Sequence, residues 1–565
     1  MVSPHFPEPP ASVPASPQRD IDALVGILNQ NKAKWLEVSH QKRIAYLREM
    51  MGHANRVSED WADAACRARG IDPASYQAGE IWFSDPMPVL RNCRQLIDAL
   101  MEKGAPKPAR LTKRKNGQWV AQVFPVNKYD KLLFAGFSGE VWIEAGKEPS
   151  QGTLCRQTEG EGKVALVLGA GNLGSIGPMD ALYKLFVENE VVVLKMNPVN
   201  EYLGPFLEAF FAPLIQDGFF GIIYGGAENG AYLTHHAHVD TIHITGSDRT
   251  HDAIVWGATP EEQVQNKAAN TPALDKPISS ELGSVTPVFI VPGNWSEKEL
   301  RYQARHVASM VAHNGSFNCV AAKTLVLASG WQQKEKFRAY LREELRGIPG
   351  RKAYYPGAQQ RYKQFLEHYP KCDALGERSE EVVPWTIIPD VAPTKAEYAL
   401  SNEAFCGVLA EVTIEAGSTK EFLEKAAATA NEEFWGTLAC TILIDPRTEK
   451  SHRETFDNFI SELRYGGISI NCWAGVVYGF GSTTWGAFPG HPLNDIRSGR
   501  GIVHNTMLYD HPERSVARAP FRMLWPPPWF VTHRNLKDLG QRMTDFEYAP
   551  RISKIPGIFL SLLKG

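Results

Sequence analysis

Hydrophobic residues recur with a helical period through the first hundred residues, after an amino-terminal arm of different composition. Apolar side chains at positions 21–28 fall on one face of a helix, as do those at positions 44–51, and a third helix is predicted over residues 89–101. The arm, residues 1–18, contains six prolines among alanine and serine. Such a composition buries little apolar surface, so we expect the arm to be flexible.

The period of the pattern changes between residues 118 and 144. Residues 118–124 and 132–143 are rich in Val, Phe, Trp and Leu, and Pro125 and two glycines interrupt them. These features predict the strands of a hairpin or small sheet.

Beyond residue 163, short apolar runs alternate with helical segments. The run at residues 164–168 suits a strand buried on both faces, and it leads through a glycine-rich turn into a helical segment. Alternation of this kind predicts a parallel sheet with a nucleotide-sized crevice at the carboxyl ends of its strands. The strands are predicted at residues 164–168, 191–194, 221–224 and 241–244.

A second alternating region begins after Glu281 and indicates a second α/β domain. Its helices are predicted at residues 297–311 and 335–346. Its strands are predicted at residues 288–291, directly after Cys319, near 408–412 and at 441–444.

Composition narrows the class of protein. A chain of 565 residues exceeds the size at which one hydrophobic core keeps growing, so two or more domains are expected. Hydrophobic residues make up 43% and charged residues 22%, as in ordinary soluble globular proteins. A formal net charge of −3 gives no basic surface for nucleic acid, which argues against that partner. The sequence predicts neither a signal peptide nor a transmembrane segment.

The eight cysteines are spread along the chain without metal-ligand or disulfide spacing. The simpler expectation is a reducing, cytoplasmic compartment and no metal site. Histidines at positions 235, 236, 238 and 243 lie close together, but no further ligand pattern follows. We therefore interpret them as loop and sheet residues.

Cys319 lies among small and amide residues just before the apolar run of residues 324–327. A thiol attacks a carbonyl only as the thiolate, so a nucleophilic cysteine needs a lowered pKa, nearby donors and access to substrate. A free cysteine is more often a small buried apolar side chain. The function of Cys319 therefore has to be judged from residues elsewhere in the chain.

A glycine-rich turn at residues 169–174 matches GxGxxG between a strand and a helix, the context of a Rossmann phosphate loop. Such a loop is normally accompanied by an acidic residue at the end of the next strand. Lys195 stands at that strand end instead. The lysine indicates a different contact with the nucleotide.

Three further segments offer candidate groups. Gly246 and Ser247 open a helix, where free backbone N–H groups suit either a pyrophosphate or a simple N-cap. Glu281, at the junction of the two α/β regions, could be a general base, although most such carboxylates are solvated. Glu403 and Phe405 form a similar short motif that alone predicts nothing.

Taken together and in this order, the motifs resemble the aldehyde dehydrogenase superfamily over about residues 163–480, with a looser helical match from residue 20. Each motif is weak alone, whereas their joint order and spacing are specific. The matching residues are Asn172 in the first βα loop, Lys195, Gly246 with Ser247, Glu281 to Gly283, Cys319, and Glu403 with Phe405.

The resemblance implies an α/β fold with two domains, parallel-type sheets and a bridging β-hairpin used in oligomers, so we expect a homodimer or homotetramer. The expected parts are the flexible arm (1–18), a helical part of the cofactor domain (19–117), the hairpin (118–150), the NAD(P)-binding domain (151–283), the catalytic domain (284–478), and a return segment with the tail (479–565).

The resemblance also implies an activity, the oxidation of an aldehyde to the carboxylic acid with NAD or NADP. Cys319 would form the thiohemiacetal and then the thioester, Asn172 would hold the oxyanion, and Glu281 would activate the hydrolytic water. The implied cofactor-binding residues are Lys195 and Glu403 at the riboses, Gly246 and Ser247 at the pyrophosphate, Phe405 at the nicotinamide, and Gly283 beside them.

Several departures mark a divergent member. Pro198 replaces the glutamate that usually follows the lysine by three residues, so a ribose-binding carboxylate is missing and NADP stays open. Ser247 and Glu281 are 34 positions apart, more than is usual, and residues 264–276 are therefore expected to be an inserted loop. Phe405 is followed by Cys-Gly where Gly-Pro is usual.

Two alternatives remain open at this point. An acylating, CoA-dependent dehydrogenase or an acyl-CoA or fatty-acid reductase of the same fold must keep water from the thioester, so Glu281 as a candidate base favours hydrolysis. A catalytically inactive binding protein on the same scaffold is the other alternative. The joint presence of Cys319, Glu281, Asn172 and Lys195 argues against it.

The nature of the aldehyde has little support in the sequence. Aromatic residues could line an entrance for an apolar or aromatic aldehyde, although so many aromatic side chains are more often core. They are Trp435, Trp473, Tyr478, Phe480, Trp485 and Phe488. The apolar ending, residues 558–563, could cover a neighbouring subunit, close the channel or make weak peripheral contact with a membrane.

Overall fold

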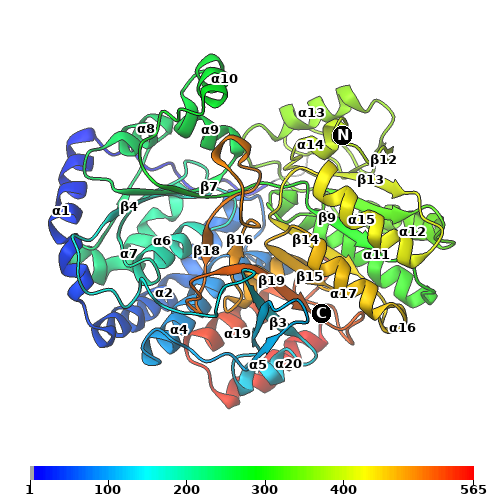
Figure 1. The fold of residues 1–565 in the computed structure, drawn as a ribbon, viewed down its shortest axis with the longest axis horizontal. Helices are drawn as coiled ribbons and strands as arrows, with labels where there is room; N and C mark the ends of the chain where they lie inside the picture. The colour runs from blue at the N-terminus through cyan, green and yellow to red at the C-terminus, as the bar shows by residue number, and fades with distance from the viewer. Residues whose placement is uncertain (1–5) are drawn as a thin grey trace.

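A computed structural model describes residues 6–565, and it consists of two α/β lobes that share a group of strands and helices along one edge. In Figure 1 the lobe around β4 and β7 lies on the left and the lobe around β9 and β13 on the right. Helices pack against both sheets, as the alternating pattern of the sequence predicts. The expected α/β fold is therefore confirmed.

The smaller sheet has six strands, of which five are parallel and one short edge strand is antiparallel. Its central strands are apolar and buried, which is why they appear in the sequence as continuous hydrophobic runs. All four strands predicted between residues 164 and 244 are present. In sheet order the strands are β17 (Gly499–Arg500), β8 (Ile278–Leu282), β7 (Thr241–Gly246), β4 (Val164–Leu168), β5 (Val191–Lys195) and β6 (Phe220–Ile223).

The larger sheet has eleven strands and continues from the second lobe into the predicted hairpin. Strand β19 pairs with β3 on one side and with β15 on the other, so the hairpin extends the sheet of its own chain. In sheet order the strands are β1 (Arg110–Lys113), β2 (Trp119–Phe124), β3 (Ser138–Ile143), β19 (Pro512–Arg518), β15 (Gly467–Ile470), β14 (Ala439–Leu443), β9 (Pro287–Ile290), β10 (Thr324–Ala328), β13 (Val408–Ile414), β12 (Thr386–Val391) and β11 (Asp373–Ala374). A separate pair is formed by β16 (Trp485–Gly486) and β18 (Ile502–His504).

The helices of the first lobe pack on the smaller sheet or on one another, and the three predicted at the amino terminus are confirmed. They are α1 (Gln18–Glu37), α2 (His40–Ala68), α3 (Gly79–Ser84), α4 (Pro86–Met101), α6 (Ile176–Phe186), α7 (Gly204–Gln216), α8 (Ala227–His235), α9 (Asp248–Trp256) and α10 (Pro260–Ala269). The helices of the second lobe are α11 (Glu297–Ala312), α12 (Lys334–Gly347), α13 (Ala358–His368), α14 (Tyr398–Ser401), α15 (Thr419–Glu433), α16 (Pro446–Ser451), α17 (Arg453–Glu462) and α18 (Gly475–Phe480).

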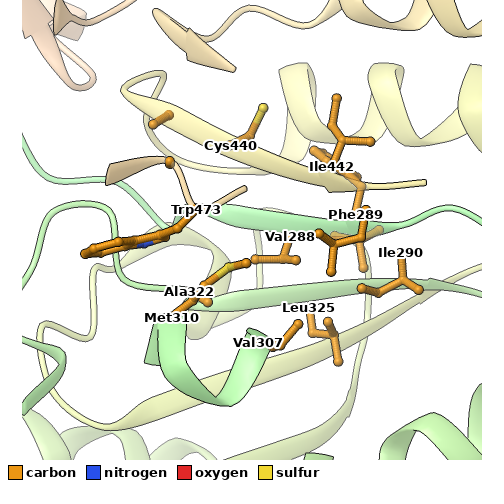
Figure 2. Packing of buried hydrophobic residues seen from close by; sticks show 14 of the residues in the cluster. Val288, Phe289, Ile290, Val307, Met310, Ala322, Leu325, Cys440, Ile442 and Trp473 are labelled. Carbon is orange, nitrogen blue, oxygen red and sulfur yellow. The ribbon is translucent and has the colours of Figure 1, made fainter. Parts of the chain in front are cut away.

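The core of the second lobe lies between its sheet and α11. Figure 2 shows Val288 of β9 and Leu325 of β10 near Met310 and Val307 of α11. These side chains are buried, and the same cluster extends to Trp473, which follows β15. A continuous core of this kind fixes the loops that leave the sheet edge.

Part of the amino-terminal arm contacts the first lobe. The Ser16 backbone N–H donates to the Tyr224 carbonyl at 3.2 Å, and the Asn229 side chain donates to the Ser16 carbonyl at 3.0 Å. The Val13 backbone N–H donates to Glu201 Oε1 at 3.2 Å. The arm therefore runs past the carboxyl end of β6. Residues 1–5, the start of the predicted flexible arm, lie outside the described residues.

Two local predictions from the sequence are wrong. Residues 132–137 are not part of a strand, because a helix, α5 (Lys128–Leu133), precedes β3 there. Asn127 caps this helix by accepting from the backbone N–H groups of Tyr129 and Asp130. The expected inserted loop contains helix α10 instead, which begins with a capping box formed by Thr259 and Glu262.

The last thirty residues contain two helices, α19 (Leu536–Tyr548) and α20 (Ile555–Leu563), that pack beside α5 at the lower edge of Figure 1. The Glu547 carboxylate on α19 is fully buried and accepts from Arg91 at 2.6 Å and from Arg94 at 2.6 and 2.9 Å. Both arginines belong to α4. This ion-pair cluster fastens α19 to the first lobe. Among residues 6–565, no helix has the length and apolarity needed to cross a membrane.

Candidate active site

The candidate nucleophile lies in a tight loop between α11 and β10. Asn314, Gly315 and Ser316 all have positive φ, so the chain turns sharply just before Cys319. The Asn314 side chain donates to the Phe317 carbonyl at 3.1 Å, and its backbone N–H donates to Glu80 at 3.1 Å. These bonds hold the loop in place. Helix and strand together therefore present the Cys319 thiol at the junction of the lobes.

Cys319 and Glu281 are in contact. The thiol donates to Glu281 Oε1 with a sulfur–oxygen distance of 3.4 Å. Burial raises the pKa of Glu281 to about 8, and the nearby Asp180 carboxylate adds to the shift. Burial also raises the pKa of the Cys319 thiol, and the Glu281 carboxylate acts in the same direction. The thiol is therefore protonated in this state, and Glu281 is the base positioned to accept its proton.

Asn172 lies on the other side of the nucleophile loop. Its side-chain amide donates to the Phe317 carbonyl at 3.0 Å, two residues before the cysteine. An amide carries two N–H bonds, and this contact uses one of them. Asn172, Glu281 and Cys319 all line the same cavity. The structure thus brings together the three residues predicted to be catalytic.

Two cavities meet at this point, and Cys319, Glu281 and Ile176 line both of them. One cavity has a volume of about 290 Å³ and contains most of the predicted cofactor-binding residues. The other has a volume of about 210 Å³ and is lined mainly by apolar side chains. The Cys319 thiol and the Glu281 carboxyl therefore lie between the two cavities, where a different ligand could reach them from each side.

Five predicted cofactor-binding residues line the 290 Å³ cavity, namely Gly246, Ser247, Gly283, Glu403 and Phe405. Ser247 caps α9, with its Oγ accepting from the Thr250 backbone N–H at 3.1 Å. A Cβ atom at Gly283 would stand 1.7 Å from Glu403 Oε2, so this position requires glycine. Glu403 Oε1 lies 3.0 Å from the Lys323 ammonium group, so the carboxylate is held at the wall of the cavity, where a ribose could reach it.

Lys195 lies outside that cavity, at the end of β5. Its ammonium group is largely buried and makes no hydrogen bond or ion pair within residues 6–565. Burial lowers its pKa to about 8, and the Glu201 carboxylate opposes the shift. A hydroxyl-bearing ligand such as an adenosine ribose would supply the missing acceptor. The described residues therefore fit a dinucleotide that extends from Lys195 to Cys319.

Sequence reasoning missed Lys323 and Glu201. The Lys323 ammonium group donates to the carbonyls of Asn318 and Cys319, both at 3.0 Å, and lies 3.0 Å from Glu403 Oε1. It thereby joins the nucleophile loop to the predicted ribose-binding carboxylate. The available signal was a charged residue inside an apolar run, Ala321 to Leu327. Glu201 gave no such signal, because only its electrostatic effect on Lys195 in the folded structure identifies it as part of the site.

A buried histidine–carboxylate cluster stands behind Glu281. Asp180 Oδ1 is 3.1 Å from His504 Nε2, and Asp180 Oδ2 is 3.6 Å from His243 Nε2. Burial opposes ionisation of Asp180, but the two histidines lower its pKa. His243 lies on β7, as a sheet residue. The ionised Asp180 explains part of the raised pKa of Glu281.

The apolar cavity leads away from Cys319 toward α19 and α20. Of the six aromatic residues predicted at an entrance, Trp473, Tyr478, Phe480 and Trp485 line it, whereas Trp435 lines the other cavity and Phe488 lines neither. The far half was not predicted. It is formed by Leu133 and Phe134, by Met523, Trp525 and Trp529, and by Leu539, Met543, Ile558 and Leu562.

No protein-family model and no curated protein matches the sequence. Solved structures do. The gamma-glutamyl-gamma-aminobutyraldehyde dehydrogenase from Burkholderia cenocepacia J2315 is 17% identical and superposes with a TM-score of 0.63 over 91% of each chain. An NAD-dependent aldehyde dehydrogenase from Sinorhizobium meliloti is 17% identical, with a TM-score of 0.62 over 93% of this chain and 92% of its own.

A third likeness is to the NADP-dependent glyceraldehyde-3-phosphate dehydrogenase from Bacillus halodurans C-125, complexed with NADP, which is 15% identical with a TM-score of 0.59 over 89% of this chain and 92% of its own. The fold and site define a two-lobed α/β protein with a cysteine and a glutamate at the junction of the lobes. That fold is the aldehyde dehydrogenase fold, as the motif order in the sequence implies.

Proposed function

We propose that this protein is an aldehyde dehydrogenase that oxidises an apolar aldehyde to its carboxylic acid with NAD or NADP. The observation that supports this most directly is the 3.4 Å contact between the Cys319 thiol and Glu281 in a wall shared by a polar and an apolar cavity. Two of the similar structures are an NAD-dependent aldehyde dehydrogenase and an NADP-dependent glyceraldehyde-3-phosphate dehydrogenase, which fits the proposal.

In the first step Cys319 attacks the aldehyde carbonyl. Its proton passes to Glu281 Oε1, the nearest acceptor, and the sulfur–carbon bond forms. The Glu281 pKa of about 8 suits this transfer near neutral pH.

The oxyanion of the thiohemiacetal requires donors. The free N–H of the Asn172 amide, which lines the same cavity as Cys319, and the Cys319 backbone N–H would supply them. A preorganised donor of this kind is worth about 3 kcal/mol of transition-state stabilisation. Asn172 is therefore proposed as an oxyanion donor.

A bound dinucleotide would accept the hydride that leaves the thiohemiacetal carbon. Glu403, held by Lys323 at 3.0 Å, would bind the nicotinamide ribose, and Phe405 would limit the position of the ring. Gly246 and Ser247 would bind the pyrophosphate at the start of α9. Lys195 would bind the adenosine ribose.

The thioester is then hydrolysed. Glu281 first releases to solvent the proton that it took from Cys319. It then takes a proton from water, the hydroxyl oxygen adds to the carbonyl carbon, and the sulfur leaves as the thiolate and recovers a proton from Glu281. Product is the carboxylic acid. A carboxyl that exchanges protons with both the Cys319 thiol and the water must lie close to both. Glu281 lines both cavities, which fits this requirement.

The nucleotide preference is proposed to be NAD. Pro198 removes the usual ribose-binding carboxylate, but Glu201 acts electrostatically on Lys195 and supplies a negative charge in that region. A carboxylate beside the ribose repels a 2′-phosphate. Calorimetric titration with NAD and NADP tests this point directly, and tighter binding of NADP would contradict it.

The central test is a coupled assay of aldehydes that differ in chain length and aromaticity, with NAD or NADP and with or without CoA. We expect reduced nucleotide and free acid without CoA, and loss of both in Cys319→Ala. Strict dependence on CoA would establish the acylating alternative. Absence of nucleotide binding, with no measured activity changed by Cys319→Ala, would establish the inactive binding protein.

A further inference from the structure

Helix α20 is apolar on its outer side as well as its inner side. Ile555, Ile558 and Leu562 point inward and are buried. Leu560 and Leu563, spaced on the opposite side, are 58% and 63% exposed. A surface helix ordinarily places polar side chains on its outer face, so folding of this chain does not account for the outer leucines.

Two neighbouring segments add to this exposed apolar area. Leu524 is 92% exposed and Leu132 of α5 is 47% exposed. Both segments adjoin α20, since the rings of Trp525 and Phe559 lie 6.3 Å apart and Leu133 packs on the cluster that contains Ile558. We call this area the leucine face, and it consists of Leu132, Leu524, Leu560 and Leu563. Apolar side chains gathered in this way mark an interaction site.

Basic side chains surround the leucine face. Lys131, Arg522, Arg551 and Lys564 are exposed, and none of them forms an ion pair within residues 6–565. Neither residues 520–534 nor residues 551–565 contain Asp or Glu. The carboxylate of α5, Asp130, is buried and turned toward Arg91 at 3.1 Å. The carboxylates of α19 beside α20, Asp538 and Asp545, are paired with Arg542 and Lys554. The four unpaired basic side chains therefore leave an excess of positive charge here, although the chain as a whole has a formal net charge of −3.

We propose that the leucine face docks on a lipid bilayer that carries anionic headgroups. Exposed leucines enter the boundary between headgroups and acyl chains, and the four basic residues contact the phosphates, which together give reversible peripheral binding. The apolar cavity reaches the same side of the molecule through Leu133 and Leu562. On the proposed function, apolar aldehydes dissolved in the bilayer would have a short path to Cys319.

Sedimentation with vesicles tests the docking without relying on enzyme activity. The full chain is mixed with vesicles of phosphatidylcholine alone or of phosphatidylcholine with phosphatidylglycerol. We expect binding only to the vesicles with phosphatidylglycerol, and weaker binding as salt is raised. The double variant Leu560→Ser/Leu563→Ser should weaken binding at least about tenfold, because it removes exposed apolar area.

The matched control is Val264→Ser, which removes an apolar side chain that is 71% exposed on α10. It should leave vesicle binding unchanged. Circular dichroism should show both variants folded, since the changed side chains face solvent. Failure of the wild-type chain to sediment with phosphatidylglycerol vesicles, or equal binding by the double variant, would overturn the proposal. A second outcome would also overturn it. If the wild-type chain does not bind vesicles and forms a dimer in light scattering, and the double variant is a monomer, the leucine face joins two copies of the chain.

Discussion

At the scale of single residues, the site consists of two acids that burial keeps protonated. Burial raises the pKa values of both the Cys319 thiol and the Glu281 carboxyl, and each group disfavours a charge on the other. When the pair loses one of its two protons, the remaining proton is therefore shared between the sulfur and the carboxylate at the 3.4 Å contact. The reactive form is reached as pH rises, or when a ligand in the adjoining cavity stabilises the charge.

Replacement of Glu281 by glutamine should remove the base and keep the shape of the side chain. We expect kcat/KM of the wild-type protein to rise with pH through a midpoint near 8, the pKa of Glu281. In Glu281→Gln this limb should disappear and kcat should fall about 10²- to 10⁴-fold. Steady-state rates between pH 6 and 9 measure both effects, and a Glu281→Gln rate within tenfold of wild type would contradict them.

The same substitution should change how stability depends on pH. The folded-state pKa of Glu281, about 8, lies above its ordinary value of 4.5. Its contribution to stability is therefore complete below pH 4.5 and is lost as pH rises toward 8. Relative to Glu281→Gln, the wild-type Tm should fall over this interval. Thermal unfolding of both proteins at several pH values provides the measurement, and parallel Tm curves would refute it.

Lys323 should matter to both the nucleophile loop and Glu403. Lys323→Met removes the ion pair at 3.0 Å and the bonds to two loop carbonyls, and it leaves a buried carboxylate unpaired. We expect weaker NAD binding and slower alkylation of Cys319 by iodoacetamide at a given pH, since a nearby cation lowers the thiol pKa. Lys420→Met, at a side chain that is 65% exposed, is the control. Unchanged alkylation and unchanged NAD affinity in Lys323→Met would contradict this role.

At the scale of elements, the order of strands and helices followed from hydrophobic periodicity, and the exceptions have local causes. The buried runs that became β4 and β5 have no polar position, so no other element suited them. The predicted strand at residues 132–143 begins too early, because Leu132 and Leu133 fit a β pattern but end helix α5. Asn127, which caps the helix, and the buried Asp130 favour the helix instead. The burial of Asp130 could not be predicted from the local sequence, because its ion-pair partner, Arg91, is distant along the chain.

Helix α19 depends on a buried charge cluster that no local pattern reveals. Burial opposes ionisation of Glu547, but Arg94 and Arg91 hold its pKa below the ordinary 4.5. Glu547→Gln leaves Arg94 without its buried carboxylate and Arg91 with Asp130 alone, and removing one partner of a buried pair costs about 3–5 kcal/mol. We expect a lower Tm and faster proteolysis after residue 518, with the wild-type advantage lost as pH falls below 4.5. Asp545→Asn, at a side chain of α19 that is 57% exposed, should change little.

At the scale of the whole molecule, parts far apart in sequence build one apolar cavity. Its wall takes residues from α4, α5, the segment around Trp473 and the last forty residues. The near half was predicted in part, because four of the six aromatic residues proposed for an entrance line it, although the sequence alone could not separate them from core residues. The far half was not, since only the placement of α19 and α20 brings Met543 and Ile558 to it. The hairpin also joined the sheet of its own chain, and its predicted role in an oligomer stays a prediction.

Filling the far half of this cavity should reduce the maximum chain length of the aldehydes that the protein accepts. Met543→Trp places a larger side chain where Met543 lines the cavity and is 5% exposed. On the proposed function, kcat/KM should fall at least about tenfold for dodecanal and stay near wild type for propanal, because only a long chain reaches that depth. Met101→Trp, at a position that is 61% exposed, controls for the substitution itself. Equal losses for both aldehydes would contradict the assignment of this cavity.

The wall that Cys319 and Glu281 share has a kinetic consequence. Dinucleotide and aldehyde would enter through separate openings, so neither would have to arrive first, and the acid could depart while the reduced dinucleotide was still bound. Double-reciprocal plots of initial rate against the two substrates should therefore intersect rather than run parallel. Product-inhibition patterns should show no compulsory order of substrate addition.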